Sequence, residues 1–146
     1  MLSGSFQSEI YPFIYAARQE HYDDVYNIGC ADGYYAIGFA RSMPGSTIYA
    51  FDSEKLAMVK TQKLATENGC QNNITFSGTF YPENLKLVLT EKKSLLIVDW
   101  EGAERNTFTK EKVGKLINAD LFIEMHINMY PDPEEYFISI LLQHTT

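Results

Sequence analysis

The chain has 146 residues, of which 45% are hydrophobic, 21% charged and 14% aromatic, which fits one globular domain and excludes a disordered or collagen-like chain. Twelve Lys and Arg residues stand against 19 Asp and Glu, and the net charge of −7 gives no electrostatic drive toward nucleic acid or anionic membranes. The sequence shows no apolar run of roughly 18 residues, no secretory signal and no CxxC pair, so we expect a cytoplasmic protein with reduced thiols and no zinc site.

Short strand-like runs alternate with helical stretches along the chain. The strands are rich in β-branched and aromatic residues, and apolar residues three and four apart mark the helices. The first predicted element is a helix over 5–20, which Pro12 interrupts. Strands are predicted over 24–28, 47–51, 73–76, 95–98 and 121–126, and further helices over 34–42, 54–67, 82–89, 109–117 and 132–143.

The helix over 54–67 has Ser53 as its predicted N-cap. Leu56, Val59 and Leu64 can lie on one face of this helix, which is its predicted apolar face. Repeated strand–helix alternation implies parallel strands, helices on both sheet faces and right-handed crossovers. In such sheets ligands bind beyond the carboxyl ends of the strands. The residues that follow each strand are therefore the candidate functional residues.

The first strand runs into a turn with two glycines, Gly29 and Gly33. Glycines at a strand-to-helix turn let the backbone approach a ligand closely. A dinucleotide-binding fingerprint would need glycine where Ala31 and Tyr34 stand, and the Gly-Lys-Ser/Thr of a phosphate loop is absent. Taken alone, the pattern is equally compatible with an ordinary tight turn.

An acidic residue, Asp52, ends the second strand. A carboxylate at this position can accept hydrogen bonds from both hydroxyls of a ribose. Asp52 and Ser53 could instead do no more than cap the following helix. The glycine turn and the acid one strand later together indicate a nucleoside ligand with little or no phosphate.

Acidic residues also follow the fourth strand, where Asp99, Glu101 and Glu104 lie within six positions. Carboxylates at the end of a buried strand are costly unless they are solvated, paired or used. On the fifth strand Glu124 and His126 alternate and so point to the same face. Each of these two also has a structural interpretation, as a hydrogen-bonding group at the sheet edge. The spacing matches no metal-ligand motif, and no metal is predicted.

These residues resemble the class I S-adenosylmethionine-dependent methyltransferases. More narrowly, Asp99-Trp100-Glu101-Gly102-Ala103-Glu104 followed by Ile123-Glu124-Met125-His126 resembles the FkbM-type methyltransferases, and residues 4–9 resemble the segment before their first motif. The resemblance covers nearly the whole chain. It implies one domain over 1–146, a Rossmann-like three-layer α/β/α sandwich with a mostly parallel sheet of order 3-2-1-4-5. The two further strands that such methyltransferases usually have are missing from the sequence, so we expect either a C-terminally truncated chain or an unusually minimal sheet edge.

The resemblance also implies a function, the O-methylation of a small hydroxylated acceptor such as a sugar or glycolipid headgroup. His126 would act as general base, and Asp99 or Glu101 would orient it or accept the proton. Tyr34 and Tyr35 either pack in the core or lie against the sulfonium. The cofactor, S-adenosyl-L-methionine, would bind at Asn27, Gly29, Cys30, Ala31, Gly33, Asp52, Ser53, Ser77 and Gly78.

Asn27 departs from the resemblance, because the family often has an acid there that favours the cofactor's ammonium group. This difference and the missing strands support an alternative, a cofactor-binding or interaction domain without turnover. A dehydrogenase-like nucleotide binder is a third hypothesis, against which the failed dinucleotide fingerprint argues. We expect a small-molecule acceptor and no nucleic-acid or membrane partner. The apolar last predicted helix is expected to pack on the sheet and on a second copy in a homodimer.

Overall fold

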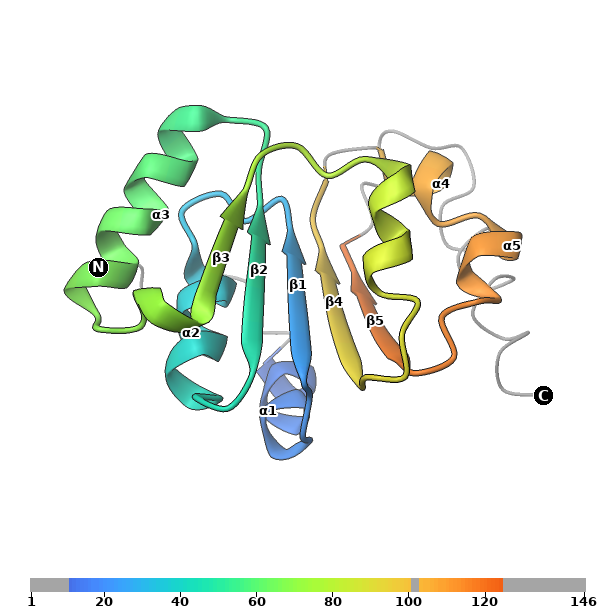
Figure 1. Cartoon of the computed structure of the whole chain (residues 1–146), viewed down its shortest axis with the longest axis horizontal. Helices are drawn as coiled ribbons and strands as arrows, with labels where there is room; N and C mark the ends of the chain where they lie inside the picture. Colours follow the sequence, from blue (N-terminus) through green and yellow to red (C-terminus); the bar gives the residue numbers. More distant parts are fainter. Residues whose placement is uncertain (1–10, 101–102, 125–146) are drawn as a thin grey trace.

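A five-stranded parallel sheet forms the centre of the molecule in the computed structural model, which describes residues 11–100 and 103–124 (Figure 1). The strand order β3-β2-β1-β4-β5 confirms the predicted order. The strands are β1 (Asp24–Ile28), β2 (Thr47–Phe51), β3 (Ile74–Ser77), β4 (Ser94–Val98) and β5 (Ala119–Ile123). The helices are α1 (Tyr11–Gln19), α2 (Tyr34–Ser42), α3 (Lys55–Glu67), α4 (Glu104–Thr107) and α5 (Lys110–Val113), with the 3-10 helices η2 (Gln71–Asn73) and η3 (Pro82–Leu87).

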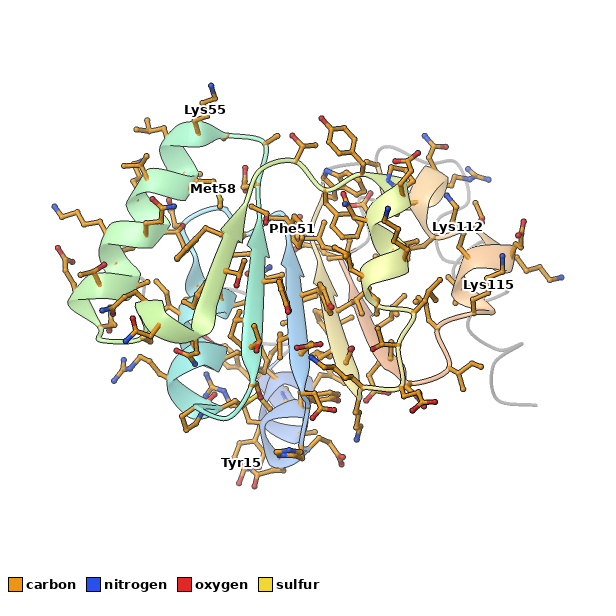
Figure 2. The ribbon with its side chains drawn as sticks, in the orientation of Figure 1. Tyr15, Phe51, Lys55, Met58, Lys112 and Lys115 are labelled. Atoms are coloured by element: carbon orange, nitrogen blue, oxygen red, sulfur yellow. The ribbon has the colours of Figure 1, made fainter. Side chains whose placement is uncertain are left out.

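Apolar side chains cover both faces of the sheet. Neighbouring residues of one strand point to opposite faces, so Val25 packs in a cluster with α1, α2 and α3, whereas Tyr26 packs in a second cluster with η3, α5 and Phe108, which follows α4. Every position of β1 and β4 is buried, as a parallel sheet between two helical layers requires. Figure 2 shows the side chains between sheet and helices, with Lys55 and Lys112 extending outward. The fold is therefore the predicted three-layer sandwich.

The strand register aligns the carboxyl ends of the strands. Ile28 of β1 pairs with Phe51 of β2 and with Val98 of β4, and Phe51 in turn pairs with Ser77 of β3. The residues that follow these strands consequently lie along one edge of the sheet. This is the edge at which ligands of open α/β sheets bind.

Helix α3 buries a different face from the one that the sequence predicted. Leu56, Val59 and Leu64 are 59%, 60% and 38% exposed. Large apolar side chains would hold the helix away from its neighbours, whereas small ones allow close packing. The buried positions are small residues four apart, Ala57, Thr61 and Ala65.

Several predicted boundaries also shift. Helix α1 continues through Pro12 without a break, and residues 5–10 of the predicted helix lie outside the described residues. Ser53 is not the N-cap of α3; Glu54 is, and its side chain makes no capping bond. The region predicted as a helix over 109–117 contains the short α5, and that over 82–89 contains the 3-10 helix η3. The predicted helix over 132–143 lies outside the described residues. Among the helices that the structure describes, none has the length and hydrophobicity needed to span a membrane.

The turn after β1 packs directly against α3. Gly33 has a φ of +78°, and a Cβ on it would lie 2.4 Å from Cγ2 of the buried Thr61. The Thr61 hydroxyl donates a hydrogen bond of 2.9 Å to the carbonyl of Ala31 in the same turn. Glycine is thus required at position 33 both for the backbone conformation and for the close approach of α3.

Gly33→Ala is therefore expected to destabilise the protein more than Gly69→Ala. Gly69 also has a positive φ, +67°, but open space surrounds the position of its missing Cβ. A left-handed alanine costs about 1–2 kcal/mol at either site, and the contact with Thr61 should add about 1–3 kcal/mol at position 33. Urea unfolding followed by circular dichroism measures both losses.

Addition of Thr61→Ser to Gly33→Ala removes the clashing methyl group but keeps the hydroxyl, so it is expected to restore part of the stability. Equal destabilisation by the two glycine substitutions would contradict the packing that we describe.

Candidate functional site

A cleft of about 390 Å³ opens at the carboxyl ends of β1, β2 and β4. Its volume falls within the roughly 300–1,000 Å³ typical of small-molecule sites. Residues from the four connections that follow β1, β2, β3 and β4 form its walls, as the aligned strand ends require. Five of the predicted site residues line it: Gly29, Ala31, Asp52, Ser53 and Asp99.

The carboxylate of Asp52 accepts hydrogen bonds from the backbone of the glycine turn and from its own connection. Its Oδ2 accepts a hydrogen bond of 2.8 Å from the Ala31 N–H, and its Oδ1 accepts one of 2.8 Å from the Glu54 N–H. The second contact is the local turn-forming bond that aspartate commonly makes two residues ahead. Because each carboxylate oxygen has two acceptor sites, Asp52 keeps acceptor capacity for a ligand. Asp52 can therefore make the hydrogen bond to Glu54 at the start of α3 and bind a ligand at the same time.

Ala31 has a positive φ of 44°, which is uncommon for a residue other than glycine. Its N–H donates to Asp52, and its carbonyl accepts from Thr61, so side chains from two other elements hold both of its polar backbone groups. Strained backbone of this kind costs on the order of 1–3 kcal/mol and persists where its surroundings fix it. The turn is therefore held in one shape at the floor of the cleft.

Gly29 allows close contact between neighbouring connections of the sheet. It has a φ of +77°, and a Cβ there would lie 1.8 Å from the carbonyl oxygen of Asp99. Its N–H donates to the Phe51 carbonyl at 2.9 Å, and the Asp99 N–H donates to the Ile28 carbonyl at 2.9 Å. A side chain at position 29 would push the end of β4 away, so glycine here sets the width of the cleft.

Three predicted cofactor-binding residues in the first strand and its turn do not line the cleft. Gly33 packs against Thr61. Cys30 is buried with its Sγ 3.6 Å from the Met58 sulfur, and burial raises the pKa of this thiol to about 12, so it stays protonated near neutral pH. Asn27 is 1% exposed, and neither polar atom of its side chain has a hydrogen-bond partner within the described part of the chain.

Ser77 and Gly78 follow β3 but also lie outside the cleft lining. The same connection contributes Phe80 instead, a residue that the sequence analysis did not select. Phe80 meets the Phe51 ring edge-to-face at 5.0 Å and the Trp100 ring at 5.7 Å. These three rings form an apolar wall opposite Asp52, and Figure 2 marks Phe51 at the end of β2. The occurrence of aromatic residues shortly after a strand end is the sequence feature by which Phe80 and Trp100 could have been predicted to line the cleft.

The acids after β4 have different environments. Asp99 lines the cleft, whereas Glu104 is 1% exposed and its Oε1 accepts a hydrogen bond of 2.9 Å from the Trp100 N–H. Glu104 therefore shapes the turn after β4. Glu101 and His126 lie outside the described residues, so their roles stay predictions. Within residues 11–100 and 103–124, no group of three or more His, Cys, Asp or Glu side chains could hold a metal ion.

Tyr34 and Tyr35 begin α2 but do not line the cleft. Tyr34 is 61% exposed, so it does not pack in the core. Tyr35 packs against the cluster on the α1–α3 face of the sheet. Burial and, to a smaller extent, the negative charges of Glu124 and Asp99 together raise the pKa of Tyr35 to about 12. Tyr35 thus lies close enough to the ends of β4 and β5 for the carboxylates of Asp99 and Glu124 to affect its pKa.

Comparison with known proteins identifies the fold. No protein-family model and no curated protein matches the sequence. Among solved structures, the O-methyltransferase TomG of Streptomyces achromogenes, involved in tomaymycin synthesis and crystallised with SAM, is 13% identical, with a TM-score of 0.62 over 90% of this chain and 63% of its own. Precorrin-6y C5,15-methyltransferase of Geobacter metallireducens is 14% identical, with a TM-score of 0.64 over 93% of this chain and 69% of its own.

A third structure, the SAH-bound methyltransferase PaMTH1 of Podospora anserina, is 17% identical, with a TM-score of 0.60 over 76% of this chain and 49% of its own. The chain thus spans less than two thirds of the length of TomG and about half that of PaMTH1. At these identities the likeness shows the fold alone. The chain has the Rossmann-like fold of the S-adenosylmethionine-dependent methyltransferases.

Proposed function

We propose that this protein is an S-adenosyl-L-methionine-dependent methyltransferase, of the FkbM type, that methylates a hydroxyl group of a small acceptor. The observation that carries the proposal is the position of Asp52, whose carboxylate binds the glycine turn and lies in the cleft with acceptor capacity remaining. TomG and PaMTH1 have the same fold and were crystallised with SAM and SAH. The strand-four run from Asp99 to Glu104 supports the narrower assignment.

The cleft residues fit this cofactor. Asp52 can accept hydrogen bonds from ribose hydroxyls through the lone pairs that the backbone does not use. The rings of Phe51, Phe80 and Trp100 offer an apolar wall suited to adenine. Gly29 lets the Asp99 connection lie directly against the glycine turn, and the amino-acid part of the cofactor would bind where these two residues line the cleft. The chemistry that the cofactor supplies is a methyl group on a positively charged sulfur.

The protein's part in such a reaction is chiefly alignment of the acceptor, which can contribute up to roughly 7–11 kcal/mol. Asp99, in the cleft wall at the end of β4, would hold the acceptor hydroxyl by a hydrogen bond. Removal of the hydroxyl proton typically accelerates such steps by about 10²–10⁴-fold. We assign the base to His126, oriented by Asp99 or Glu101, since a free imidazole has a pKa of about 6.5. Phe80 and Trp100 would exclude water from the cleft.

The acceptor is proposed to be a small molecule, with a sugar or glycolipid headgroup suggested by the FkbM resemblance, and the protein is proposed to form a homodimer. We propose a cytoplasmic location, because Cys30 and Cys70 are both free, buried thiols.

Titration calorimetry with SAM and SAH tests the cofactor assignment. The protein is expected to bind both, and Asp52→Asn is expected to weaken binding by about tenfold to hundredfold. Hydrogen bonds to a charged acceptor contribute about 1.5–3 kcal/mol, and 1.4 kcal/mol corresponds to tenfold in affinity. Asp32→Asn is the matched control, because Asp32 is an exposed acid of the same turn that does not line the cleft. No binding of either compound by the folded wild-type protein at millimolar concentration would refute the assignment.

Cofactor binding without turnover is a second candidate, favoured by Asn27. The buried, uncharged amide offers no negative charge beneath the turn for the ammonium group of the cofactor. This candidate predicts that SAH affinity survives Asp99→Ala and His126→Ala, and that labelled methyl groups pass to no hydroxylated acceptor. Methyl transfer that Asp99→Ala abolishes would exclude it.

A further inference from the structure

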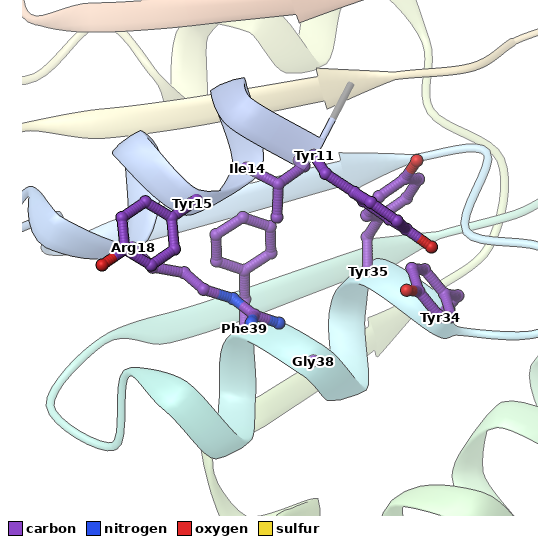
Figure 3. A pocket seen from close by; sticks show the side chains of 8 residues that line it. All are labelled: Tyr11, Ile14, Tyr15, Arg18, Tyr34, Tyr35, Gly38 and Phe39. Carbon is purple, nitrogen blue, oxygen red and sulfur yellow. The ribbon is translucent and has the colours of Figure 1, made fainter. Parts of the chain in front are cut away.

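A second cavity, of about 210 Å³, lies between α1 and α2 (Figure 3). We call it the tyrosine pocket, because Tyr11 and Tyr15 of α1 and Tyr34 and Tyr35 of α2 line it, together with Arg18. A cavity of about 150 Å³ can hold benzene, and drug-sized ligands need roughly 300 Å³ or more. The volume therefore suits a single six-membered ring with small substituents.

The tyrosines form an ordered wall with both ring faces and hydroxyl groups. Tyr34 and Tyr35 meet edge-to-face with centroids 5.3 Å apart. A side-chain hydrogen bond links Tyr11 to Tyr34 and raises the pKa of Tyr11. Figure 3 shows these three side chains together at one end of the cavity. Yet Tyr15 and Tyr34 are 69% and 61% exposed, so core packing does not account for so many rings at one site.

Arg18 provides a positive charge at the other end of the cavity (Figure 3). Its guanidinium lies over the Phe39 ring, 5.9 Å from the centroid, and has no ion-pair partner among residues 11–100 and 103–124. Acidic residues are plentiful in a chain with a net charge of −7. An arginine that lies beside a cavity and has no acidic partner among the described residues is therefore unusual. Its planar fork of donors matches a carboxylate.

Gly38 keeps the space beside this guanidinium open. It lies inside α2, where glycine costs about 0.5–1 kcal/mol relative to alanine. A Cβ at this position would lie 3.2 Å from a terminal nitrogen of Arg18. The glycine therefore lets the guanidinium lie this close to α2, at the wall of the pocket that both residues line.

The tyrosine end of the pocket lies at the same edge of the sheet as the proposed reaction site. Helix α2 begins immediately after the glycine turn, so Tyr34 and Tyr35 lie at the same sheet edge as the cleft. Asp99 lines the cleft, and its charge together with that of Glu124 acts on the Tyr35 hydroxyl. A ring in the pocket would thus extend from Arg18 toward Asp99.

We propose that the tyrosine pocket binds the methyl acceptor, and that the acceptor is a small hydroxylated ring with one carboxylate, which Arg18 binds while a hydroxyl points toward Asp99. The acceptor role rests on the proposed function. Aromatic hydroxy acids and sugar acids share the chemistry that the pocket would recognise, so the experiment includes one of each.

The test is titration of the whole protein, without cofactor, with 3,4-dihydroxybenzoate and glucuronate, each beside its neutral counterpart, 3,4-dihydroxybenzyl alcohol or glucose. At least one acid is expected to bind about tenfold or more tightly than its counterpart. Arg18→Gln is expected to abolish this preference. Arg41→Gln is the matched control, since Arg41 contacts Asn68 at 3.4 Å and does not line the pocket.

Gly38→Ala is a second variant, because alanine favours the helix and so keeps the fold while it crowds the guanidinium. It is expected to weaken acid binding and to leave SAH binding unchanged. Failure of both acids to bind, or equal acid binding by Arg18→Gln and Arg41→Gln, would overturn the proposal while SAH binding persists. Acid binding by a protein that does not bind SAH would overturn the acceptor role together with the proposed function.

Discussion

The backbone of Ala31 is the point on which the functional edge of this molecule depends. Its N–H is bound by the Asp52 carboxylate and its carbonyl by the Thr61 hydroxyl, so a left-handed alanine is fixed by side chains from β2's end and from α3. Two hydrogen bonds of this kind, one to a charged group, can together offset a strain on the order of 1–3 kcal/mol. The glycines before and after Ala31 then allow β4 and α3 to approach on opposite sides.

The fixed turn lines one of two cavities that differ in chemistry, and α2, which follows the turn, lines the other. On one side, Asp52 and an aromatic wall offer acceptors and ring faces to a nucleoside. The other cavity is lined by the paired tyrosines at the start of α2 and by Arg18 of α1. This combination suits a ring that carries a negative charge. Asp99 lies where the two meet, since it lines the first cavity and acts electrostatically on Tyr35 of the second. A donor and an acceptor bound in this arrangement would meet at the end of β4.

The sequence predicted β1 and β2 to the residue, because each is a short run with β-branched and aromatic residues that ends at a glycine or an aspartate. Asp52 was predicted for the same reason, since its place follows from chain order. The buried face of α3 was not predicted. It consists of small residues that let the helix pack closely, and these are much less hydrophobic than Leu56 and Val59 on the exposed face. The tyrosine pocket was missed because α1 and α2 meet only through tertiary packing, which residue spacing does not encode.

Amide NMR spectra of the labelled protein, recorded during titration with SAH, test the central claim most directly. The account predicts that the largest shifts fall on Ala31 and Glu54, whose N–H groups Asp52 binds, and on Trp100 in the cleft wall, while Gly45 and Gly69 stay unchanged. Shifts centred on other strand ends, or none at millimolar SAH, would contradict the assignment of the cleft to an adenosyl amino acid.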